Sequence, residues 1–202
     1  MKLTEKSVAA LLEEFRSSAP TPGGGSAAAL AGAIGASLLA MVASLPKPRA
    51  TSDADLRHLR LAGERCAALA RELEDLIDRD SAAYDLVMSS YRLPKASDEE
   101  KAARAAAIQQ ALRSAIAAPL DVMRACSAAA GIGQVTRSLG NANAASDVEV
   151  GLELLRAGLR GARLNVEINL GSVKDAGYVE DVTREVQELS ESGAAGAPSA
   201  SA

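Results

Sequence analysis

Apolar residues recur along most of this chain with the spacing of an α-helix. The longest pattern runs from Leu56 to Tyr91, where apolar positions follow one another in alternating steps of three and four residues. Such a heptad pattern predicts one helix that ends before Pro94 and measures ~60 Å if it is unbroken. Because this length exceeds a compact domain of this size, we expect the helix to pack along a partner subunit as well.

A second predicted helix is apolar on every side. Residues 27–45 carry no charge and are rich in Ala, and they include Gly32 and Gly35, where neighbouring backbones can approach closely. A helix of this kind is either a core helix or a membrane span. The weak hydrophobicity of a run built mainly on Ala favours a core helix, which Pro46 and Pro48 end.

Capping residues and apolar spacing predict four further helices. Thr4 caps the first of them, and a capping box that begins at Ser97 starts another. Ser146 starts the last long helix, which ends at Gly171, and apolar residues over 179–189 outline a short final helix.

These elements belong to one predicted domain, residues 1–190, which is followed by a low-complexity, disordered tail at 191–202. The 202 residues include no Trp, one Phe and three Tyr, so the core must be built from Ala, Leu, Val and Ile. Ala favours helices over strands, and no segment alternates as a strand should. The predicted fold class is therefore all-α, a bundle of long helices around the small-residue core helix.

Charge and cysteine usage exclude several classes of protein. A net charge of −4 with mixed signs gives no basic surface for nucleic acid, and the charged first residues are not a secretory signal. Cys66 and Cys126 lack CxxC spacing and have apolar neighbours, so we expect reduced core thiols. His58 is the only histidine and lies off the heptad pattern, so no His-based triad or zinc site is available. These features predict a cytoplasmic protein with no membrane partner.

Residues 20–26 (PTPGGGS) form the first candidate site. Two prolines stiffen the segment, Gly23, Gly24 and Gly25 free its backbone, and Ser26 is placed to cap the core helix. Backbone amides at a helix N-terminus can hold an anion or a carbonyl group. The segment matches neither a Walker loop nor GxGxxG. Either a ligand cradle or a tight turn before a buried helix fits these residues.

Asp80 interrupts the apolar heptad pattern between Ile77 and Tyr84. A buried carboxylate must be hydrogen-bonded, paired with a charge, or protonated with a raised pKa. Asp80 is therefore either a polar residue that fixes the register of the helices or a carboxyl group held ready for proton transfer.

Asn165 and Asn169 lie one helical turn apart among apolar residues. Their amides can bind the edge of a heterocycle or tie neighbouring helices together. Asp147 falls on the same face as Asn165, but a distance of ~27 Å along the helix separates them. If both contact a ligand, the protein has either two sites or a site that needs a second subunit.

Six segments together carry a resemblance to a known family. They are residues 20–26, 80–84, 91–95, 99–104, 140–147 and 164–170. In this order they resemble the cyclodeaminase/cyclohydrolase family over about residues 5–190. That family comprises the C-terminal cyclodeaminase domain of formiminotransferase-cyclodeaminase and the stand-alone bacterial methenyltetrahydrofolate cyclohydrolases.

The resemblance implies an all-helical homodimer formed through long helices, with a tetrahydrofolate substrate. The implied reaction is hydrolysis of 5,10-methenyl-tetrahydrofolate to 10-formyl-tetrahydrofolate. The alternatives are cyclodeamination of formimino-tetrahydrofolate with release of ammonia, and a non-catalytic folate-binding or scaffold dimer. The methenyl carbon is a cationic amidinium and already electrophilic, so no metal or cofactor is expected.

The resemblance also assigns roles to single residues. Asp80 is the implied general acid and base, and Tyr84 and Asn169 are the groups that orient it or the substrate. The implied substrate-binding residues are Gly23, Gly24, Gly25, Ser26, Lys47, Arg49, Lys95, Asn141, Asp147 and Asn165. Of these, Lys47, Arg49 and Lys95 are expected to attract the glutamate carboxylates of the folate. Family members usually carry a lysine-rich stretch with a tyrosine where this chain has residues 46–50 (PKPRA).

Overall fold

The computed structural model describes residues 2–46 and 52–194, and it is helical as predicted, with no strand among those residues. The helices are α1 (Val8–Arg16), α2 (Gly24–Ser44), α3 (Asp53–Tyr91), α4 (Asp98–Leu139), α5 (Ala145–Leu170) and α6 (Ala176–Ala194). Two short 3₁₀ helices, η1 (Leu3–Glu5) and η2 (Ala142–Ala144), precede α1 and α5.

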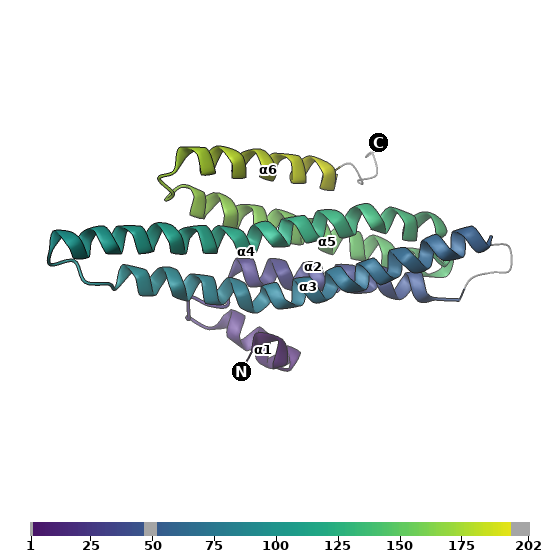
Figure 1. Cartoon of the computed structure of the whole chain (residues 1–202). Coiled ribbons are helices and arrows are strands. Elements are labelled where there is room, and N and C mark those ends of the chain that lie inside the picture. Colours follow the sequence, from purple (N-terminus) through teal and green to yellow (C-terminus); the bar gives the residue numbers. More distant parts are fainter. Residues whose placement is uncertain (1, 47–51, 195–202) are drawn as a thin grey trace, which may run out of the picture.

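Helices α2, α3, α4 and α5 form a four-helix bundle in which α2 and α4 each pack against both α3 and α5. Helix α6 lies outside the bundle against α4 and α5, and α1 lies on the opposite side (Figure 1). At one end α3 and α4 extend beyond α2 and α5 (Figure 1). The buried core lies between the four bundle helices, with Leu39, Leu73, Met123 and Leu155 among its fully buried side chains.

Helix α2 is the core helix that the sequence predicts, and its small residues let other helices approach closely. A Cβ atom added to Gly32 would lie 2.6 Å from Cys126 Sγ, and one added to Gly35 would lie 2.6 Å from the backbone oxygen of Gly151. Neither contact leaves room for a methyl group. The close approach of α5 to α2 therefore depends on a glycine at position 35.

The predicted start of α2 is wrong, and so is the prediction that Ser26 caps it. The helix begins at Gly24 with Gly23 as its N-cap residue, which places Ser26 inside the first turn. Gly24 and Gly25 have low helix propensity, so the local sequence does not favour a first turn at this place. Tertiary contacts with α3 and α5, described below, select this start.

Other boundaries also differ from the predictions. Ser7, rather than Thr4, caps α1, because Thr4 lies in η1 and its hydroxyl donates to Asp78 Oδ2 at 3.1 Å. Helix α5 begins at Ala145, directly after η2, one residue before the predicted start. Helix α6 runs to Ala194, so the predicted tail begins too early. Residues 195–202 lie outside the described part of the chain.

The local signals of the long helices are confirmed. Helix α3 has 39 residues and ends at Tyr91, and the capping box at Ser97 starts α4. Gly171 is the C-cap residue of α5, at the end that the sequence predicts, and Gly140 is the C-cap residue of α4. These features depend on a few neighbouring residues, which is why the sequence alone reveals them.

The two cysteines and the histidine lie where the sequence analysis put them. Cys66 and Cys126 are free and buried in the core, and His58 is exposed on α3. Burial raises the pKa of the Cys66 thiol to about 11 and that of Cys126 to about 12. Both thiols are therefore protonated packing groups at neutral pH.

The heptad pattern of α3 is covered largely by the chain itself. Leu59, Leu73 and Ile77 are buried in the bundle, where α2 and α4 pack against α3. Tyr84 and Tyr91, near the C-terminal end of α3, are exposed. The middle of α3 thus needs no partner subunit, and the length of this helix is not by itself a reason for dimerisation.

Helices α2 and α4 are long and apolar enough to cross a membrane by length and composition alone. In each, 56% of the most apolar window is buried within the fold, as is usual for core helices. The bundle therefore provides an apolar environment for both helices.

Replacement of Gly35 by Ala tests the close contact between α2 and α5. We expect Gly35→Ala to lower the free energy of unfolding by roughly 1–3 kcal/mol, because the added methyl group meets backbone atoms that cannot move independently. Gly131→Ala in α4 is the matched control, since its Cβ would meet nothing within 4 Å. Urea unfolding followed by circular dichroism measures both changes. A Gly35→Ala variant as stable as the parent would contradict the close contact.

Candidate functional site

A cavity of about 340 Å³ lies where α2 begins, between α3 and α5. This volume is in the range of small-molecule binding sites. Its lining residues come from the segment before α2, from α2 itself, and from α3, α4 and α5. They are Pro20, Thr21, Gly23, Gly24, Asp80, Tyr84, Val87, Ala115, Asn165, Ile168 and Asn169.

Asp80 reaches this cavity because Gly25 has no side chain. A Cβ atom at Gly25 would lie 2.1 Å from Asp80 Oδ1 and 2.5 Å from its Cγ, so the carboxyl group fills the space of the missing side chain. The backbone N–H of Ser26 donates to Asp80 Oδ2 at 2.9 Å, and the Ser26 hydroxyl lies 3.2 Å from the same oxygen. The first turn of α2 thus fixes one end of this carboxyl group.

Burial raises the pKa of Asp80 above its ordinary value, because the ionised form loses contact with water. The side-chain and backbone hydrogen bonds from Ser26 act in the opposite direction and lower it. A carboxyl group that keeps its proton to higher pH than usual, in a cavity of this size, suits general acid–base chemistry.

Asn165 and Asn169 present their side-chain amides from one face of α5. Asn165 Nδ2 donates to the backbone oxygen of Gly161 at 2.8 Å. Asn169 Nδ2 donates to the backbone oxygens of Asn165 at 2.9 Å and Ala115 at 3.3 Å. Asn169 therefore ties α5 to α4. The amide nitrogen of Asn169 uses both of its protons in these bonds, whereas that of Asn165 uses one of its two. The amide oxygens and the second N–H of Asn165 are therefore the groups that remain for a ligand.

The cavity joins six of the predicted site residues, namely Gly23, Gly24, Asp80, Tyr84, Asn165 and Asn169. Gly25 and Ser26 stand directly beside them but contact Asp80. From the sequence, the backbone amide of Ser26 was expected to hold a ligand. The structure corrects this point, because that N–H is used by Asp80 Oδ2.

Three predicted binding residues lie away from this cavity, and two more fall outside the residues that the structure describes. Asn141 precedes α5 and donates to the backbone oxygen of Pro46 at 2.8 Å, and Asp147 lies in the first turn of α5, at the end opposite to Asn165. Lys95 is exposed in the turn between α3 and α4. Lys47 and Arg49 fall within residues 47–51, which the structure does not describe. Among the described residues, the lining of the Asp80 cavity therefore contains no lysine or arginine side chain.

Five lining residues were given no binding or catalytic role by the sequence. Pro20 and Thr21 belong to the candidate segment 20–26, whereas Val87, Ala115 and Ile168 were in no candidate site. Val87 follows Tyr84 by three residues and Ile168 follows Asn165 by three, so helical spacing could have identified both. Ala115 comes from α4, and nothing in the sequence indicates that α4 reaches this cavity.

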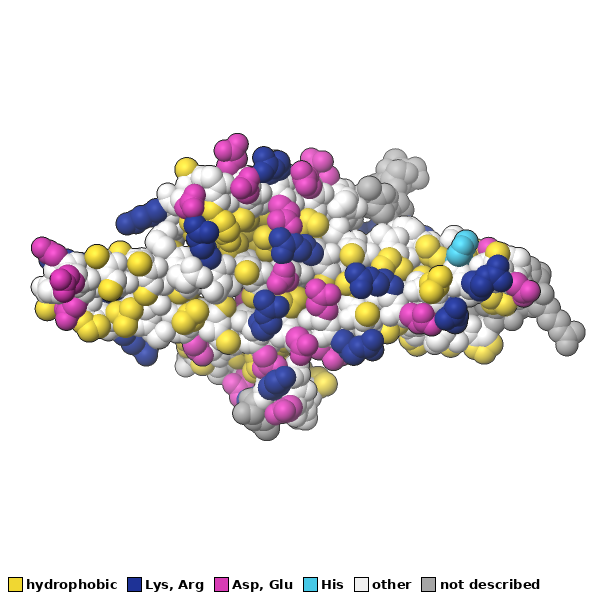
Figure 2. All heavy atoms as spheres, viewed as in Figure 1, with side chains coloured by type: hydrophobic (Ala, Val, Ile, Leu, Met, Phe, Trp, Pro, Cys, Tyr) yellow, Lys and Arg dark blue, Asp and Glu magenta, His cyan; other side chains and the backbone are white. Residues whose placement is uncertain are grey.

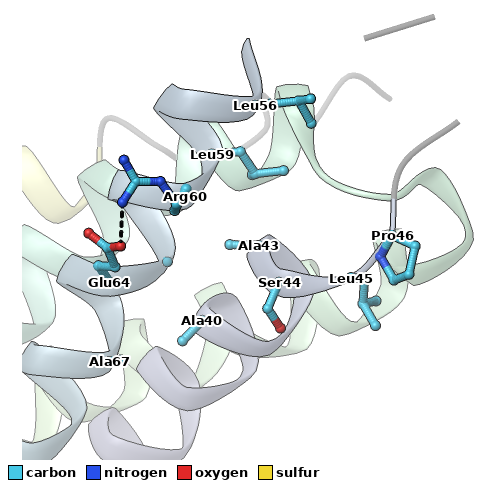
Figure 3. Close-up of a pocket in the computed structure, with 11 residues that line it drawn as sticks. Ala40, Ala43, Ser44, Leu45, Pro46, Leu56, Leu59, Arg60, Glu64 and Ala67 are labelled. Atoms are coloured by element: carbon cyan, nitrogen blue, oxygen red, sulfur yellow. Dashed lines mark hydrogen bonds and ion pairs between the residues drawn. The ribbon is translucent and has the colours of Figure 1, made fainter. Parts of the chain in front are cut away.

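A larger cavity of about 530 Å³ lies at the other end of α2, against the start of α3 (Figure 3). Its described lining is mostly apolar. Arg60 and Glu64 are the charged residues of that lining, and they pair with each other at 2.7 Å (Figure 3). Because this cavity offers no free acid or base among the described residues, the smaller cavity with Asp80 is the better candidate for chemistry.

Comparison with known proteins agrees with this arrangement. A family model described as formiminotransferase-cyclodeaminase matches residues 7–188. The chain belongs to this family. The resemblance inferred from the sequence motifs is thus confirmed, and it covers nearly the whole bundle.

Relatives of this family differ in length and in the activity that their names describe. The chain is 41% identical to the methenyltetrahydrofolate cyclohydrolase of Methylorubrum extorquens, over 91% of this chain and 88% of that protein. It is 34% identical to the formimidoyltransferase-cyclodeaminase of Rattus norvegicus, over 93% of this chain but only 35% of that protein. The chain thus spans nearly all of the bacterial relative and about a third of the rat one.

The fold itself is shared with a solved structure. The crystal structure of formiminotetrahydrofolate cyclodeaminase from Thermotoga maritima superposes with a TM-score of 0.85 at 26% identity. The match covers 96% of this chain and 93% of that chain. The arrangement of helices that forms the Asp80 cavity therefore belongs to the family fold.

The raised pKa of Asp80 predicts how stability depends on pH. In the unfolded chain an Asp titrates near ~3.9, so between that pH and the higher folded pKa the folded state binds more protons than the unfolded state. Stability is then lost as the pH rises through this window. Asp80→Asn removes the titration, so its melting temperature relative to the parent should increase as the pH rises above the pKa of the unfolded Asp and level off once the pH exceeds the raised pKa of Asp80.

Thermal unfolding of both proteins across this pH range measures the difference. Asp85→Asn is the matched control, because Asp85 is exposed on the same helix and does not line the cavity. A difference between Asp80→Asn and the parent that stays constant with pH would contradict the raised pKa.

Proposed function

We propose that this protein hydrolyses 5,10-methenyl-tetrahydrofolate to 10-formyl-tetrahydrofolate. The observation that carries the proposal is the carboxyl group of Asp80, which is held by Ser26 at the wall of a cavity of small-molecule size. The 41% identity with a methenyltetrahydrofolate cyclohydrolase, over most of both chains, supports this reaction over others in the family.

The chemistry needs one group that first accepts and then donates a proton. Water adds to the cationic methenyl carbon while Asp80 takes one of its protons, which gives a neutral tetrahedral intermediate. The bond from this carbon to N5 then breaks as Asp80 returns the proton to N5, and loss of the remaining hydroxyl proton leaves the N10-formyl group. One proton is released overall. The cation is electrophilic from the start, so the proposed reaction requires no cofactor or metal ion.

Neighbouring side chains are suited to orient the reactants. The amide oxygens of Asn165 and Asn169 can accept hydrogen bonds from the pterin or from the attacking water. Tyr84 borders the same cavity as Asp80 and can hold the water with its hydroxyl group. Groups whose positions are fixed before the substrate binds lower the entropic cost of reaching the transition state. Helix α5 fixes both amides through the backbone hydrogen bonds described above.

Asp80→Asn tests the proposed reaction. We expect turnover to fall by at least ~100-fold, because Asn can neither accept nor return the proton. The assay follows the loss of the near-ultraviolet absorbance of methenyl-tetrahydrofolate above its spontaneous rate, and Asp85→Asn is again the control. A near-normal rate in Asp80→Asn, with the parent active, would move the chemistry to another group.

Cyclodeamination of formimino-tetrahydrofolate is the second candidate function. Two observations favour it, the name of the rat relative and the name of the structural relative from Thermotoga maritima. Both reactions pass through a similar tetrahedral carbon, so the same residues can serve either one. Incubation with formimino-tetrahydrofolate separates them, since a cyclodeaminase produces methenyl absorbance and releases ammonia. If neither folate is converted and neither raises the melting temperature, the protein is a scaffold without folate chemistry.

We also propose a homodimer, formed through the side of the bundle where α2 and α5 pack together. Helix α2 carries no charged residue, yet Ile34 and Met41 are exposed on it. On the adjacent α5, Leu164 and Ile168 are 66% and 76% exposed. By contrast, charged side chains are spread over the face of α3, α4 and α6 that Figure 2 shows. An uncharged helix face can pair with its own copy without needing opposite charges.

Such a dimer would give roles to residues far from Asp80. Helices α2 and α5 are antiparallel, since Gly24 lies near Asn165 while Gly35 lies near Gly151. A two-fold axis perpendicular to α2 would bring the start of α5 in the second copy next to the Asp80 cavity. This is the arrangement in which Asn141 and Asp147 could bind the same substrate as Asp80.

Ile34→Glu tests the dimer. A buried glutamate at this position should split the dimer into monomers, because an unpaired charge is costly in an apolar interface. Sedimentation velocity at micromolar concentration measures the change, and Val8→Glu on α1 is the control, since Val8 is an exposed valine outside the α2–α5 side. A parent protein that is monomeric under these conditions would refute the proposal.

The proposed enzyme acts in the cytoplasm on a soluble folate, without nucleic acid or membrane as partner. Its net charge of −4 supports the absence of a nucleic-acid partner, and its two free, buried thiols fit a reducing compartment. Lys95 remains a candidate contact for the negatively charged tail of the folate.

A further inference from the structure

Ser26 is a polar residue with no exposure to solvent, although it lies beside the candidate site. Three oxygen atoms of α3 surround its hydroxyl group. The backbone oxygen of Ile77 lies at 2.8 Å, and Asp80 Oδ2 and Ser81 Oγ each lie at 3.2 Å. Ser26 does not line the cavity, so its hydroxyl group acts on α3 and not on a ligand.

A serine hydroxyl has only one proton to donate and two lone pairs with which to accept. The backbone oxygen of Ile77 can only accept, so at 2.8 Å the proton of Ser26 points to it. In that orientation Ser26 Oγ offers no proton to Asp80 Oδ2. When Asp80 is ionised, the hydroxyl of Ser26 turns and donates to Oδ2. Whether this one bond forms therefore depends on the charge of Asp80.

The two oxygens of Asp80 have different surroundings. Oδ2 accepts the Ser26 N–H at 2.9 Å. A carboxylate oxygen and the carbonyl oxygen of a neutral acid can both accept such a bond, which keeps the carboxyl group in place. Within the described part of the chain Oδ1 accepts no hydrogen bond, and it is not among the buried polar atoms that lack a partner. Oδ1 is therefore the oxygen that remains reachable from the cavity.

We propose that Ser26 is the positioning residue of Asp80 and that its hydroxyl group turns between two acceptors during each turnover. It donates to Ile77 when Asp80 is neutral and to Asp80 Oδ2 when Asp80 is charged, while Oδ1 exchanges the proton with water and with N5 of the substrate. This inference rests on the proposed function in so far as Asp80 is the acid and base of the reaction.

The rotation serves a group that must be stable in both charge states. During the reaction Asp80 gains a proton from water and returns it to N5, so its charge changes twice in each cycle. The Ser26 proton is never transferred and only changes its acceptor. The ionised carboxylate then has two donors on Oδ2, and the neutral acid keeps the backbone donor. The carboxyl group can stay in one position while its charge changes.

Ser26→Ala tests this role through the pH dependence of kcat. Asp80 must be ionised to take a proton from water, so kcat rises with pH through its pKa in the substrate complex. Loss of the hydroxyl removes one hydrogen bond that lowers the pKa of Asp80. The rise of kcat should therefore move to higher pH by about one unit, while KM changes less than about twofold. Ser37→Ala is the matched control, because Ser37 lies exposed on the same helix and bonds only to Ala33.

A second measurement needs no turnover and therefore tests the inference even if the proposed function fails. The melting temperature of Asp80→Asn minus that of the parent, followed against pH, reports the titration of Asp80. The same comparison is then made without the Ser26 hydroxyl, as the melting temperature of the double variant Ser26→Ala/Asp80→Asn minus that of the single variant Ser26→Ala. We expect the pH at which this difference rises to be higher without the hydroxyl.

Three results would overturn the inference. An increase in KM with an unmoved pH profile would make Ser26 a substrate contact. A uniform loss of kcat at every pH, with unshifted titration of Asp80, would make it a packing residue. If Ser26→Ala does not fold, Ser26→Cys replaces it, since a thiol of similar size is a weak donor and should shift both pH profiles upward. Unshifted profiles in Ser26→Cys would then refute the role.

Discussion

The close packing of a helix built from small residues is the constraint on which the rest of this structure depends. Helix α2 approaches α3, α4 and α5 so closely that Gly25, Gly32 and Gly35 have no room for a Cβ atom. Gly25 contacts α3, Gly32 contacts both α3 and α4, and Gly35 contacts α5. A charge-free helix can be surrounded in this way, because it has no ionised side chain that must be kept in water. The small residues of α2 therefore set the distances at which α3, α4 and α5 pack against it.

The same constraint creates the candidate site. Because α2 starts with glycines, the carboxyl group of Asp80 can enter the space where a side chain would be, and Ser26 can bond to it through both backbone and hydroxyl. Burial of Asp80 opposes folding when the group is ionised. A group that is costly to bury but held in a fixed place is typical of functional sites, which give up some stability for activity. On this view Gly25 and Asp80 act together, although 55 positions separate them in the chain.

Much of the fold could be predicted because the signals are local. Helical periodicity, the capping box at Ser97 and the C-cap glycines at 140 and 171 each involve residues within one or two turns, so they persist in any tertiary context. Two of the boundaries that were missed are decided by distant contacts. Thr4 bonds to Asp78 across the chain, and the start of α2 is determined by Asp80. Neither contact has a counterpart in the nearby sequence.

The sequence by itself determined the fold class, the family, the small-residue core helix and the polar interruption at Asp80. It also named six of the residues that line the cavity. Only the tertiary structure decided which predicted site residues meet, because this depends on α5 running antiparallel to α2. That arrangement brings Asn165 and Asn169 to the start of α2 and leaves Asn141 and Asp147 at its other end. The structure also decided that Ser26 faces Asp80 and not a ligand, since the direction of a side chain in a helix depends on the neighbouring helices that pack against it.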